Sequence, residues 1–342
     1  MLSSGRLCLV VDLDLTLVNS VTREEVEATG GPEAVQALDA RAAAFEKAEQ
    51  ERRPGQPPVP SPLWRLDEQG MWTKLRPGAR ALLEAARPRF VLWVHTNARA
   101  DYAAAVLRRL DPGGALFGDR VIAQGADLAK GLHARGLAGL EAVALVLDDN
   151  AAVWPEHPLN VLLVEPYHYF EASRRRARLA GPSLEAIRAD EDEAQGMLAC
   201  ALRVLCEAHA RVMRALRAPP KLTPEGVRAW RNWDVRAALA AERATVLEGI
   251  TMAFSAVLPR DFPEPERHPL WSLARAFGAD VRLELTDECS HLVCASGATA
   301  KAALARRMGV CVVGVEWLRA SVTLWKRARE SAYPAKNHYG GA

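Results

Sequence analysis

The stretch LCLVVDLDLT, residues 7–16, joins an apolar run to two aspartates, Asp12 and Asp14, which stand two positions apart. In a parallel sheet, the residues just past the carboxyl end of a strand line the crevice in which ligands bind. Spacing by two places both carboxylates on one side of an extended segment. We therefore expect residues 7–11 to form a strand that presents Asp12 and Asp14 to one substrate.

Two further apolar runs in the first 170 residues also end in polar residues. Residues 90–94 lead into Thr96, and residues 143–147 lead into Asp148 and Asp149. Other segments continue the alternation of apolar runs and helical patterns, with strands expected at 121–123 and 161–164 and a helix at 100–110. This alternation predicts an α/β domain built on a parallel sheet.

The four aspartates are expected at the same edge of that sheet, because the carboxyl ends of parallel strands meet there. Four carboxylates in one place repel one another unless a cation neutralises them. An all-oxygen carboxylate site suits Mg²⁺. The sequence therefore predicts a magnesium site made by Asp12, Asp14, Asp148 and Asp149.

The rest of the chain falls into three parts: a long insertion between the first two expected strands, a helical segment and a second small domain. Residues 24–53 look helical, and the proline-rich residues 54–62 should form an extended surface loop. Strand signals stop after Glu171, and residues 190–216 read as one amphipathic helix that Pro219 and Pro220 end. After Gly249 short strands and helices return, which predicts a second α/β domain.

Composition excludes several classes of protein. The 44 Lys and Arg residues nearly balance the 42 Asp and Glu residues, so a strongly basic nucleic-acid binder is disfavoured. No apolar run approaches the roughly 20 residues that span a bilayer, and the first residues lack a basic segment typical of signal peptides. The six cysteines include no CxxC pair, so we expect reduced thiols in an intracellular protein without a membrane or nucleic-acid partner.

The aspartate motif resembles the DxDx(T/V) signature of the haloacid dehalogenase-like phosphatases. Lys74-Leu75-Arg76-Pro77-Gly78 is similar to the KLRPG segment of the members that act on the C-terminal domain of RNA polymerase II. Later segments resemble the end of that catalytic domain and a C-terminal BRCT domain, namely Leu147-Asp148-Asp149, Val153-Trp154, NVLLVEPYHYF at 160–170, Asp234-Val235-Arg236, Arg243, VLEG at 246–249, Trp317-Leu318 and Trp325-Lys326-Arg327. The whole combination resembles the branch of the family that carries a BRCT domain and associates with TFIIF.

This resemblance implies a domain order and a function. A phosphatase domain would occupy residues 1–171, a helical connector residues 172–246 and a BRCT domain residues 247–337. The implied protein is a nuclear, Mg²⁺-dependent serine phosphatase that removes phosphate from the heptad repeat of RNA polymerase II through an aspartyl-phosphate intermediate. TFIIF is a partner that the resemblance raises, and the absence of an acidic tail in this sequence leaves that pairing open.

The resemblance also implies roles for single residues. Asp12 would be the nucleophile, and Asp14 the acid and then the base. Thr96 would bind a phosphate oxygen, and Lys130 would neutralise the transferring group. Mg²⁺ would bind Asp12, the Asp14 backbone carbonyl and Asp149, with Asp148 nearby or bound through water.

Two departures and three alternatives accompany this interpretation. Leu15 stands where many members carry a polar residue, and Gln124 stands near the position expected for a phosphate-facing arginine. The alternatives are a phosphatase of the same superfamily that acts on a small molecule, one that acts on another phosphoprotein, and a non-catalytic BRCT scaffold. Residues 167–170 could line a peptide groove or pack in the core. Ser255 and Lys301 match phosphate-binding positions of some BRCT domains.

Overall fold

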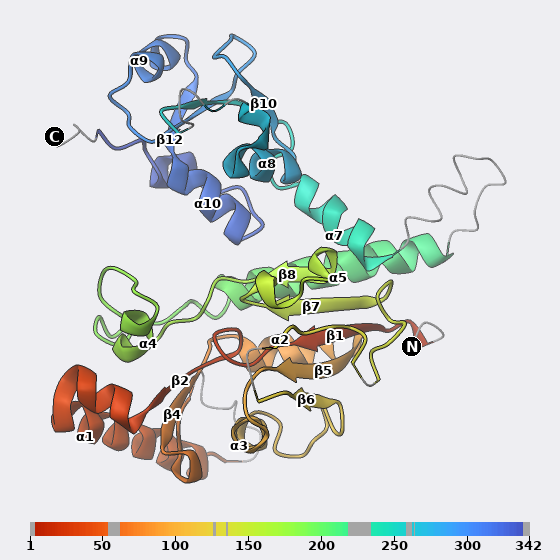
Figure 1. The fold of residues 1–342 in the computed structure, drawn as a ribbon, viewed down its shortest axis with the longest axis vertical. Coiled ribbons are helices and arrows are strands. Elements are labelled where there is room, and N and C mark those ends of the chain that lie inside the picture. Colours follow the sequence, from red (N-terminus) through yellow and green to blue (C-terminus); the bar gives the residue numbers. More distant parts are fainter. Residues whose placement is uncertain are drawn as a thin grey trace. The chain divides into compact units, whose positions relative to one another are not determined.

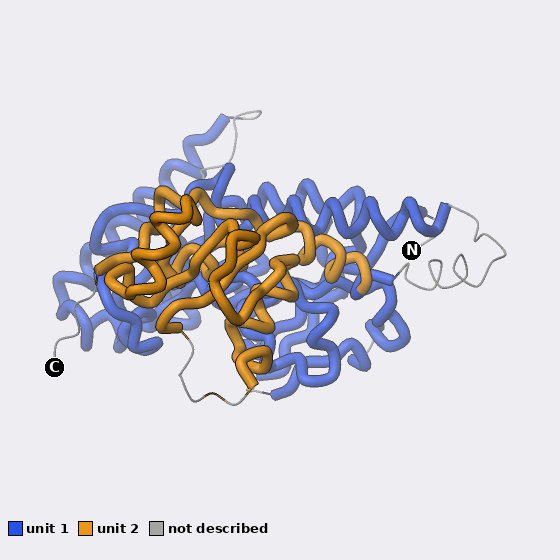
Figure 2. Tube along the Cα trace, turned by 90° about the horizontal axis from the view of Figure 1, so that it is seen from above, with its two compact units in different colours: residues 1–236 blue, residues 237–342 orange. Residues whose placement is uncertain are grey.

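The chain forms two compact units, residues 1–236 and 237–342, which Figure 2 colours separately. The computed structural model describes residues 4–53, 62–125, 128–134, 136–217, 234–257, 262 and 264–337. The predicted loop at residues 54–62 falls almost entirely outside these ranges, as does the predicted helix end at Pro219 and Pro220. Each unit is described by itself below.

The first unit is built on the predicted parallel sheet, which the structure confirms. Its five strands lie in the order β6-β5-β1-β7-β8 (Figure 1). Their bounds are β1 (Leu7–Val11), β5 (Phe90–Thr96), β6 (Val121–Ala123), β7 (Ala144–Asp148) and β8 (Val161–Leu163). Strand β1 is central and fully buried because β5 and β7 pair with it on both sides. Val11 is in register with Val94 and with Leu147, so the residues that follow all three strands emerge at one edge.

Helices α2 (Ala79–Ala86) and α3 (Ala100–Leu110) lie between strands of this sheet, α4 (Glu171–Arg176) and α5 (Met197–Arg217) follow its last strand, and short 3₁₀ turns occur in both units. Helix α7 (Val235–Ala244) spans the boundary between the two units. Short 3₁₀ turns are η2 (Asp67–Gln69), η3 (Ala151–Val153), η4 (Pro158–Asn160), η5 (Pro265–Arg267) and η6 (Glu330–Ala332). Helix α5 carries an apolar stripe at helical spacing and packs on α2. The predicted helix at 100–110 is confirmed as α3.

The prediction of one helix over residues 190–216 is wrong at its start. Helix α5 begins at Met197, because the preceding acidic residues make tertiary contacts instead of helical turns. Asp190 forms an ion pair with Lys74, and Glu191 forms one with the buried Arg76. Asp192 accepts hydrogen bonds from the backbone of the residues just before α5. These contacts hold the segment against the first unit, which helical periodicity could not indicate.

The insertion between β1 and β5 contains an antiparallel sheet that the sequence pattern did not predict. Strands β2 (Val18–Thr22), β3 (Leu63–Leu66) and β4 (Met71–Leu75) pair antiparallel in the order β2-β4-β3. Helix α1 (Arg23–Gln50) begins with a capping box, in which Thr22 and Glu25 bond each other's backbone N–H, and it packs on β3. The strands are short, and along the chain β2 precedes the long helix α1 whereas β3 and β4 follow it. The local sequence pattern was therefore too weak to predict them.

The second unit holds a four-stranded parallel sheet in the order β10-β9-β11-β12. Its elements are β9 (Thr251–Ser255), α8 (Pro269–Ala276), β10 (Asp280–Arg282), β11 (His291–Cys294), α9 (Ala300–Arg307), β12 (Cys311–Gly314) and α10 (Val315–Thr323). Trp317 of α10 is fully buried, stacks on His291 and donates its indole N–H to the Ala328 carbonyl at 2.9 Å. The predicted second α/β domain is therefore present.

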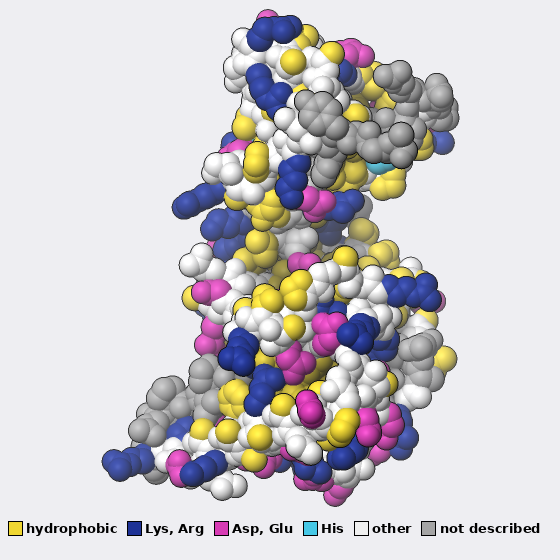
Figure 3. All heavy atoms as spheres, turned by 90° about the vertical axis from the view of Figure 1, so that its left-hand side faces the viewer, with side chains coloured by type: hydrophobic (Ala, Val, Ile, Leu, Met, Phe, Trp, Pro, Cys, Tyr) yellow, Lys and Arg dark blue, Asp and Glu magenta, His cyan; other side chains and the backbone are white. Residues whose placement is uncertain are grey.

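The surface carries side chains of both charges. On the face shown in Figure 3, Lys and Arg side chains are interspersed with Asp and Glu side chains. All six cysteines are free thiols, and three of them are buried. Within the described ranges, no helix combines the length and apolarity that crossing a membrane requires.

We predict that Asn19→Ala destabilises the first unit by about 3 kcal/mol, because it leaves buried donors without an acceptor. The Asn19 side-chain oxygen accepts the backbone N–H groups of Tyr169 (2.8 Å) and Phe170 (3.1 Å), and its amide donates to Ser173. Urea unfolding of the full chain measures the change. Glu27→Ala, on the exposed side of α1, is the control and should change stability by less than about 0.5 kcal/mol. Equal effects of the two substitutions would contradict the prediction.

Candidate functional site

Three of the four predicted carboxylates, those of Asp12, Asp148 and Asp149, meet at the carboxyl edge of the five-stranded sheet, and Asp14 is not part of this group. Asp12 follows β1, and its backbone N–H donates to the Leu147 carbonyl of β7 at 3.0 Å. Carboxylate oxygens of Asp12, Asp148 and Asp149 all lie within 4.8 Å of one another. Asp12 is only 6% exposed and Asp148 only 1%, so the cluster is withdrawn from water.

Lys130 lies between two of these carboxylates. Its Nζ donates to Asp12 Oδ1 at 2.6 Å and to Asp148 Oδ2 at 2.8 Å. Burial acts to lower the pKa of Lys130, but the two adjacent carboxylates outweigh it and raise that pKa above its usual value. Lys130 therefore stays an ammonium group and offsets part of the repulsion between Asp12 and Asp148.

Asp148 is mainly an anchor for Lys130. Besides the lysine, its Oδ2 accepts the indole N–H of Trp154 at 2.9 Å, and its Oδ1 accepts the backbone N–H of Asn150. Donors from the protein thus occupy both oxygens. The sequence interpretation placed Asp148 beside the metal without this role. It included Trp154 in the resemblance but assigned it no role, because an aromatic residue after a strand carries no specific local signal.

Asp149 is better placed to offer an oxygen to a cation. Its backbone N–H donates to the buried Thr16 hydroxyl at 3.0 Å, and that hydroxyl donates to Asp149 Oδ1 at 3.3 Å. Burial, with the adjacent Asp148 charge, raises the pKa of Asp149 to about 6. A nearby cation would favour the charged form. Since the cluster offers only carboxylate oxygens, its donor set fits Mg²⁺.

Asp14 lies at the end of a chain of hydroxyl groups. Tyr102 of α3 donates to Asp14 Oδ1 at 2.5 Å, and the Tyr102 hydroxyl in turn contacts Ser20 at 2.6 Å. Ser20 contacts Thr73 at 2.8 Å, so the chain runs from β4 through β2 to Asp14. Burial raises the pKa of Asp14, and the Tyr102 hydrogen bond opposes that rise. Tyr102 was not anticipated, because it looks like one more core residue of an amphipathic helix.

Arg76 supports the loop that carries Asp14 and Thr16. Its guanidinium is fully buried and donates to the carbonyls of Thr16 (3.2 Å) and Glu165 (2.9 Å), and it forms two hydrogen bonds with Glu191. Leu15 adopts a left-handed φ of 61°, and its carbonyl accepts the Tyr167 N–H at 2.8 Å. The resemblance included Arg76 without assigning it a role. The structure gives it the role of holding this strained turn.

Thr96 and Gln124 reach the same edge from neighbouring strands. Thr96 ends β5, is buried, and accepts the Ala98 N–H on its hydroxyl at 3.1 Å. Gln124 follows β6, and its amide donates to Asn97 at 2.8 Å. Gln124 therefore supplies a neutral amide near the position where an arginine was expected. His95 is buried with its pKa lowered by burial to about 4, so it is a neutral core residue.

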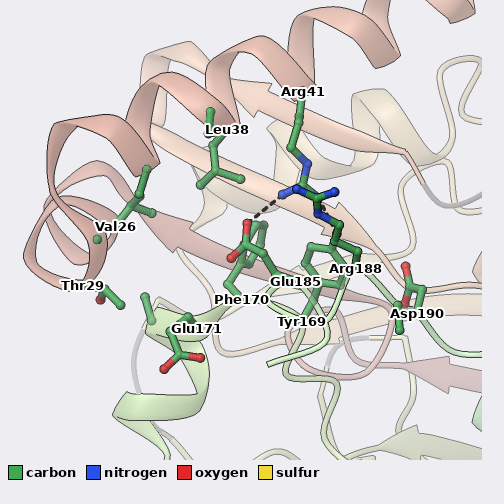
Figure 4. Close-up of a pocket in the computed structure, with 15 residues that line it drawn as sticks. Val26, Thr29, Leu38, Arg41, Tyr169, Phe170, Glu171, Glu185, Arg188 and Asp190 are labelled. Atoms are coloured by element: carbon green, nitrogen blue, oxygen red, sulfur yellow. Dashed lines mark hydrogen bonds and ion pairs between the residues drawn. The ribbon is translucent and has the colours of Figure 1, made fainter. Parts of the chain in front are cut away.

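A pocket of about 730 Å³ lies between helix α1 and the residues that follow β8 (Figure 4). Helix α1 supplies Leu38 and Arg41 to its wall, and the segment after β8 supplies Tyr169 and Phe170. Arg41 forms an ion pair with Glu185 at 2.8 Å across the pocket. Tyr169 and Phe170 are largely buried, so they pack in the core, and both also line this pocket.

Comparison with family models identifies both units. A model described as NLI interacting factor-like phosphatase matches residues 7–179. A model described as twin BRCT domain matches residues 256–317. The two matches correspond to the five-stranded unit with its insertion and to the four-stranded unit.

The proteins that this chain resembles in sequence or structure include several named as RNA polymerase II C-terminal domain phosphatases. The chain is 34% identical to RNA polymerase II C-terminal domain phosphatase-like 3 of Arabidopsis thaliana, across 97% of this chain and 26% of that protein. It is 35% identical to the phosphatase-like 4 protein of the same plant, across 79% of this chain and 59% of that protein. The chain thus spans only part of the length of these relatives. A solved structure of Fcp1, described as an essential RNA polymerase II CTD phosphatase, matches 97% of both chains with a TM-score of 0.62 at 22% identity, which supports the fold.

We predict that Asp149→Asn weakens Mg²⁺ binding at least tenfold, because it removes a charged oxygen ligand. Thr16→Val should weaken it by roughly three- to tenfold, since it removes a hydrogen bond worth about 1 kcal/mol that orients Asp149. Isothermal titration calorimetry with Mg²⁺ measures both effects. Thr96→Val is the matched control, because its hydroxyl contacts the Ala98 backbone and not the carboxylates. If Asp149→Asn binds Mg²⁺ like the natural chain, the cation site lies elsewhere.

Proposed function

Because the chain belongs to the NLI interacting factor-like phosphatase family, we propose that it is a Mg²⁺-dependent phosphoserine protein phosphatase. The observation that carries this proposal is the placement of Lys130 between Asp12 and Asp148, with Asp149 beside them. One nucleophilic carboxylate, one ammonium group and one cation site at a sheet edge suit transfer of an anionic phosphoryl group. The names of the plant relatives support the heptad repeat of RNA polymerase II as the substrate.

In the first step, Asp12 attacks phosphorus in line and forms an aspartyl phosphate while the bond to the serine oxygen breaks. Asp14 donates its proton to that leaving oxygen. The raised pKa of Asp14, which results from burial, favours the protonated form that this step needs. Lys130 and Thr96 stabilise the charge on the transferring oxygens.

In the second step, water attacks the aspartyl phosphate, Asp14 accepts the proton of that water, and the bond from phosphorus to Asp12 breaks. Inorganic phosphate leaves, and both aspartates return to their starting states. When bound by Asp12, the Asp14 backbone carbonyl and Asp149, Mg²⁺ supplies positive charge that stabilises the phosphoryl oxygens. Asp148 holds Lys130 in place throughout.

The pocket in Figure 4 supports a peptide substrate over a small molecule. The pocket is linked to the turn that carries Asp14 and Thr16. The backbone N–H of Tyr167 donates to the Leu15 carbonyl in that turn, and Tyr169, two residues later, lines the pocket. Apolar and aromatic walls that are linked to the turn after Asp14 in this way offer binding surface that a sugar phosphate would not use. A peptide that extends from the phosphoserine could use it.

The cellular setting follows from the same proposal. A chain that acts on the RNA polymerase II repeat would work in the nucleus. The BRCT unit would then recruit the chain to phosphorylated partners. Ser255 and Lys301, which match phosphate-binding positions of some BRCT domains, contact Thr299 (2.9 Å) and Glu284, and a phosphate would have to replace these contacts. TFIIF stays a prediction of the sequence resemblance.

We predict that Asp12→Asn and Asp14→Asn each lower turnover of a Ser-phosphorylated heptad peptide by at least about a thousandfold, since each removes a group that reacts. Phosphate release with and without Mg²⁺ measures this, and thermal melts check that the variants remain folded. Asp119→Asn, an exposed carboxylate away from the cluster, is the control and should keep normal turnover.

Three substrates separate the remaining alternatives. Turnover of para-nitrophenyl phosphate excludes the non-catalytic scaffold. A higher kcat/KM for the phosphopeptide than for sugar phosphates supports the protein phosphatase, and the reverse order contradicts it. Near-normal peptide turnover by Asp12→Asn would show that the mechanism is wrong.

We predict that Tyr102→Phe moves the alkaline limb of the kcat/KM profile to higher pH. The Tyr102 hydrogen bond lowers the pKa of Asp14, so its loss raises that pKa further. Because Asp14 acts first as an acid, activity declines as the pH passes its pKa, and a higher pKa delays that decline. Ser20→Ala is the control, since it keeps the Tyr102 to Asp14 bond and should produce a smaller shift. A shift to lower pH in Tyr102→Phe would exclude this role.

A further inference from the structure

Three metal-ligating side chains gather on two loops outside the carboxylate cluster. His133 lies on the loop after Lys130, and Glu156 and His157 lie on the segment after β7. Each offers a ligand atom, and these atoms all lie within 4.8 Å of one another. His133 Nδ1 is 3.7 Å from Glu156 Oε2, and the two imidazole centroids are 6.4 Å apart. The chemistry proposed above uses none of the three.

We propose that His133, Glu156 and His157 form a second metal site, which takes a first-row transition metal ion such as Zn²⁺. Two imidazole nitrogens and one carboxylate are ligands that Zn²⁺ prefers, and three protein ligands leave a fourth position for water. Mg²⁺ prefers oxygen ligands, so it is directed to the Asp12 cluster instead. The two sites thus differ in ligand chemistry.

The observed geometry is close to what such an ion requires. Metal–ligand bonds of about 2.1 Å in a tetrahedral site place ligand atoms about 3.4 Å apart. The His133 and Glu156 side chains are 69% and 71% exposed, so small rotations can close the remaining gap without moving the core. Among the described residues, the ion pair that these side chains form is the one that they make with each other, at 3.7 Å.

Two local features favour metal binding over a chance cluster. The Nε2 atom of His157 is buried and has no hydrogen-bond partner within the described part of the chain, so this nitrogen is free to bind an ion. Gly131 provides the space in which the His133 ring lies, because a Cβ at that position would stand 2.1 Å from His133 Cε1. The backbone at Gly131 therefore permits the position of the His133 imidazole.

The site would link two loops that support the catalytic cluster. Lys130 stands three residues before His133, and Trp154 stands two residues before Glu156. The same loops already meet where the Lys130 N–H bonds the Val153 carbonyl at 2.6 Å. A bound ion would add a second link and stabilise the folded chain by mass action, since the unfolded chain does not hold the three ligands together.

The test is Zn²⁺ binding by the full chain without a histidine tag, in saturating Mg²⁺ so that the carboxylate cluster is filled. Isothermal titration calorimetry should show one equivalent of Zn²⁺, and His133→Gln and His157→Gln should each weaken it at least tenfold. Gly131→Ala should also weaken it, because the added Cβ displaces the His133 ring without removing a ligand. His268→Asn, which removes a histidine in the other unit, should have no effect.

A second readout is thermal stability. Zn²⁺ should raise the melting temperature of the natural chain and of His268→Asn, but not that of His133→Gln. Melts without Zn²⁺ check folding, and if a histidine variant is unfolded, the exposed Glu156→Gln decides by the same two measurements. Equal Zn²⁺ affinity in the natural chain and in these variants overturns the proposal, as does Zn²⁺ binding that saturating Mg²⁺ abolishes.

Discussion

The buried guanidinium of Arg76 is the constraint on which the arrangement of the first unit depends. A charge withdrawn from water costs several kcal/mol unless surrounding groups satisfy it. Here the carbonyls of Thr16 and Glu165 and the carboxylate of Glu191 do so, although they come from three distant parts of the sequence. The hydrogen bonds of this one side chain therefore fix the turn at Thr16, the segment after β8 and the residues that precede α5 relative to one another.

The same balance of charge operates at the sheet edge. Asp12 and Asp148 repel each other, and burial raises the pKa of Asp12 to about 8 even though Lys130 lies beside it. Lys130 therefore offsets only part of this effect, and Trp154 orients the carboxylate that holds Lys130. The cluster is thus ordered by protein contacts. Asp149 stays available to a cation because, in the described part of the chain, its carboxylate accepts a side-chain hydrogen bond from Thr16 alone.

Local sequence patterns predicted the parallel sheet well because its strands are short apolar runs separated by helices. The positions of Asp12, Thr96, Asp148 and Asp149 at one edge followed from that topology. The antiparallel strands β2, β3 and β4 escaped prediction because they are short and because β2 is separated from its partner β4 by the long helix α1 and by β3. The start of α5 was wrong because Asp190 and Glu191 pair with Lys74 and Arg76, and periodicity carries no information about such partners.

By itself, the sequence determined which residues can do chemistry and at which edge of the sheet they stand, since both follow from residue type and strand order. Only the tertiary structure decided how those residues are held. Arg76, Tyr102 and Trp154 read locally as ordinary basic or apolar positions, and each acquires its role from an acceptor brought to it by the fold. The physical reason is that hydrogen bonds and ion pairs depend on distance in space, which separation along the chain does not specify.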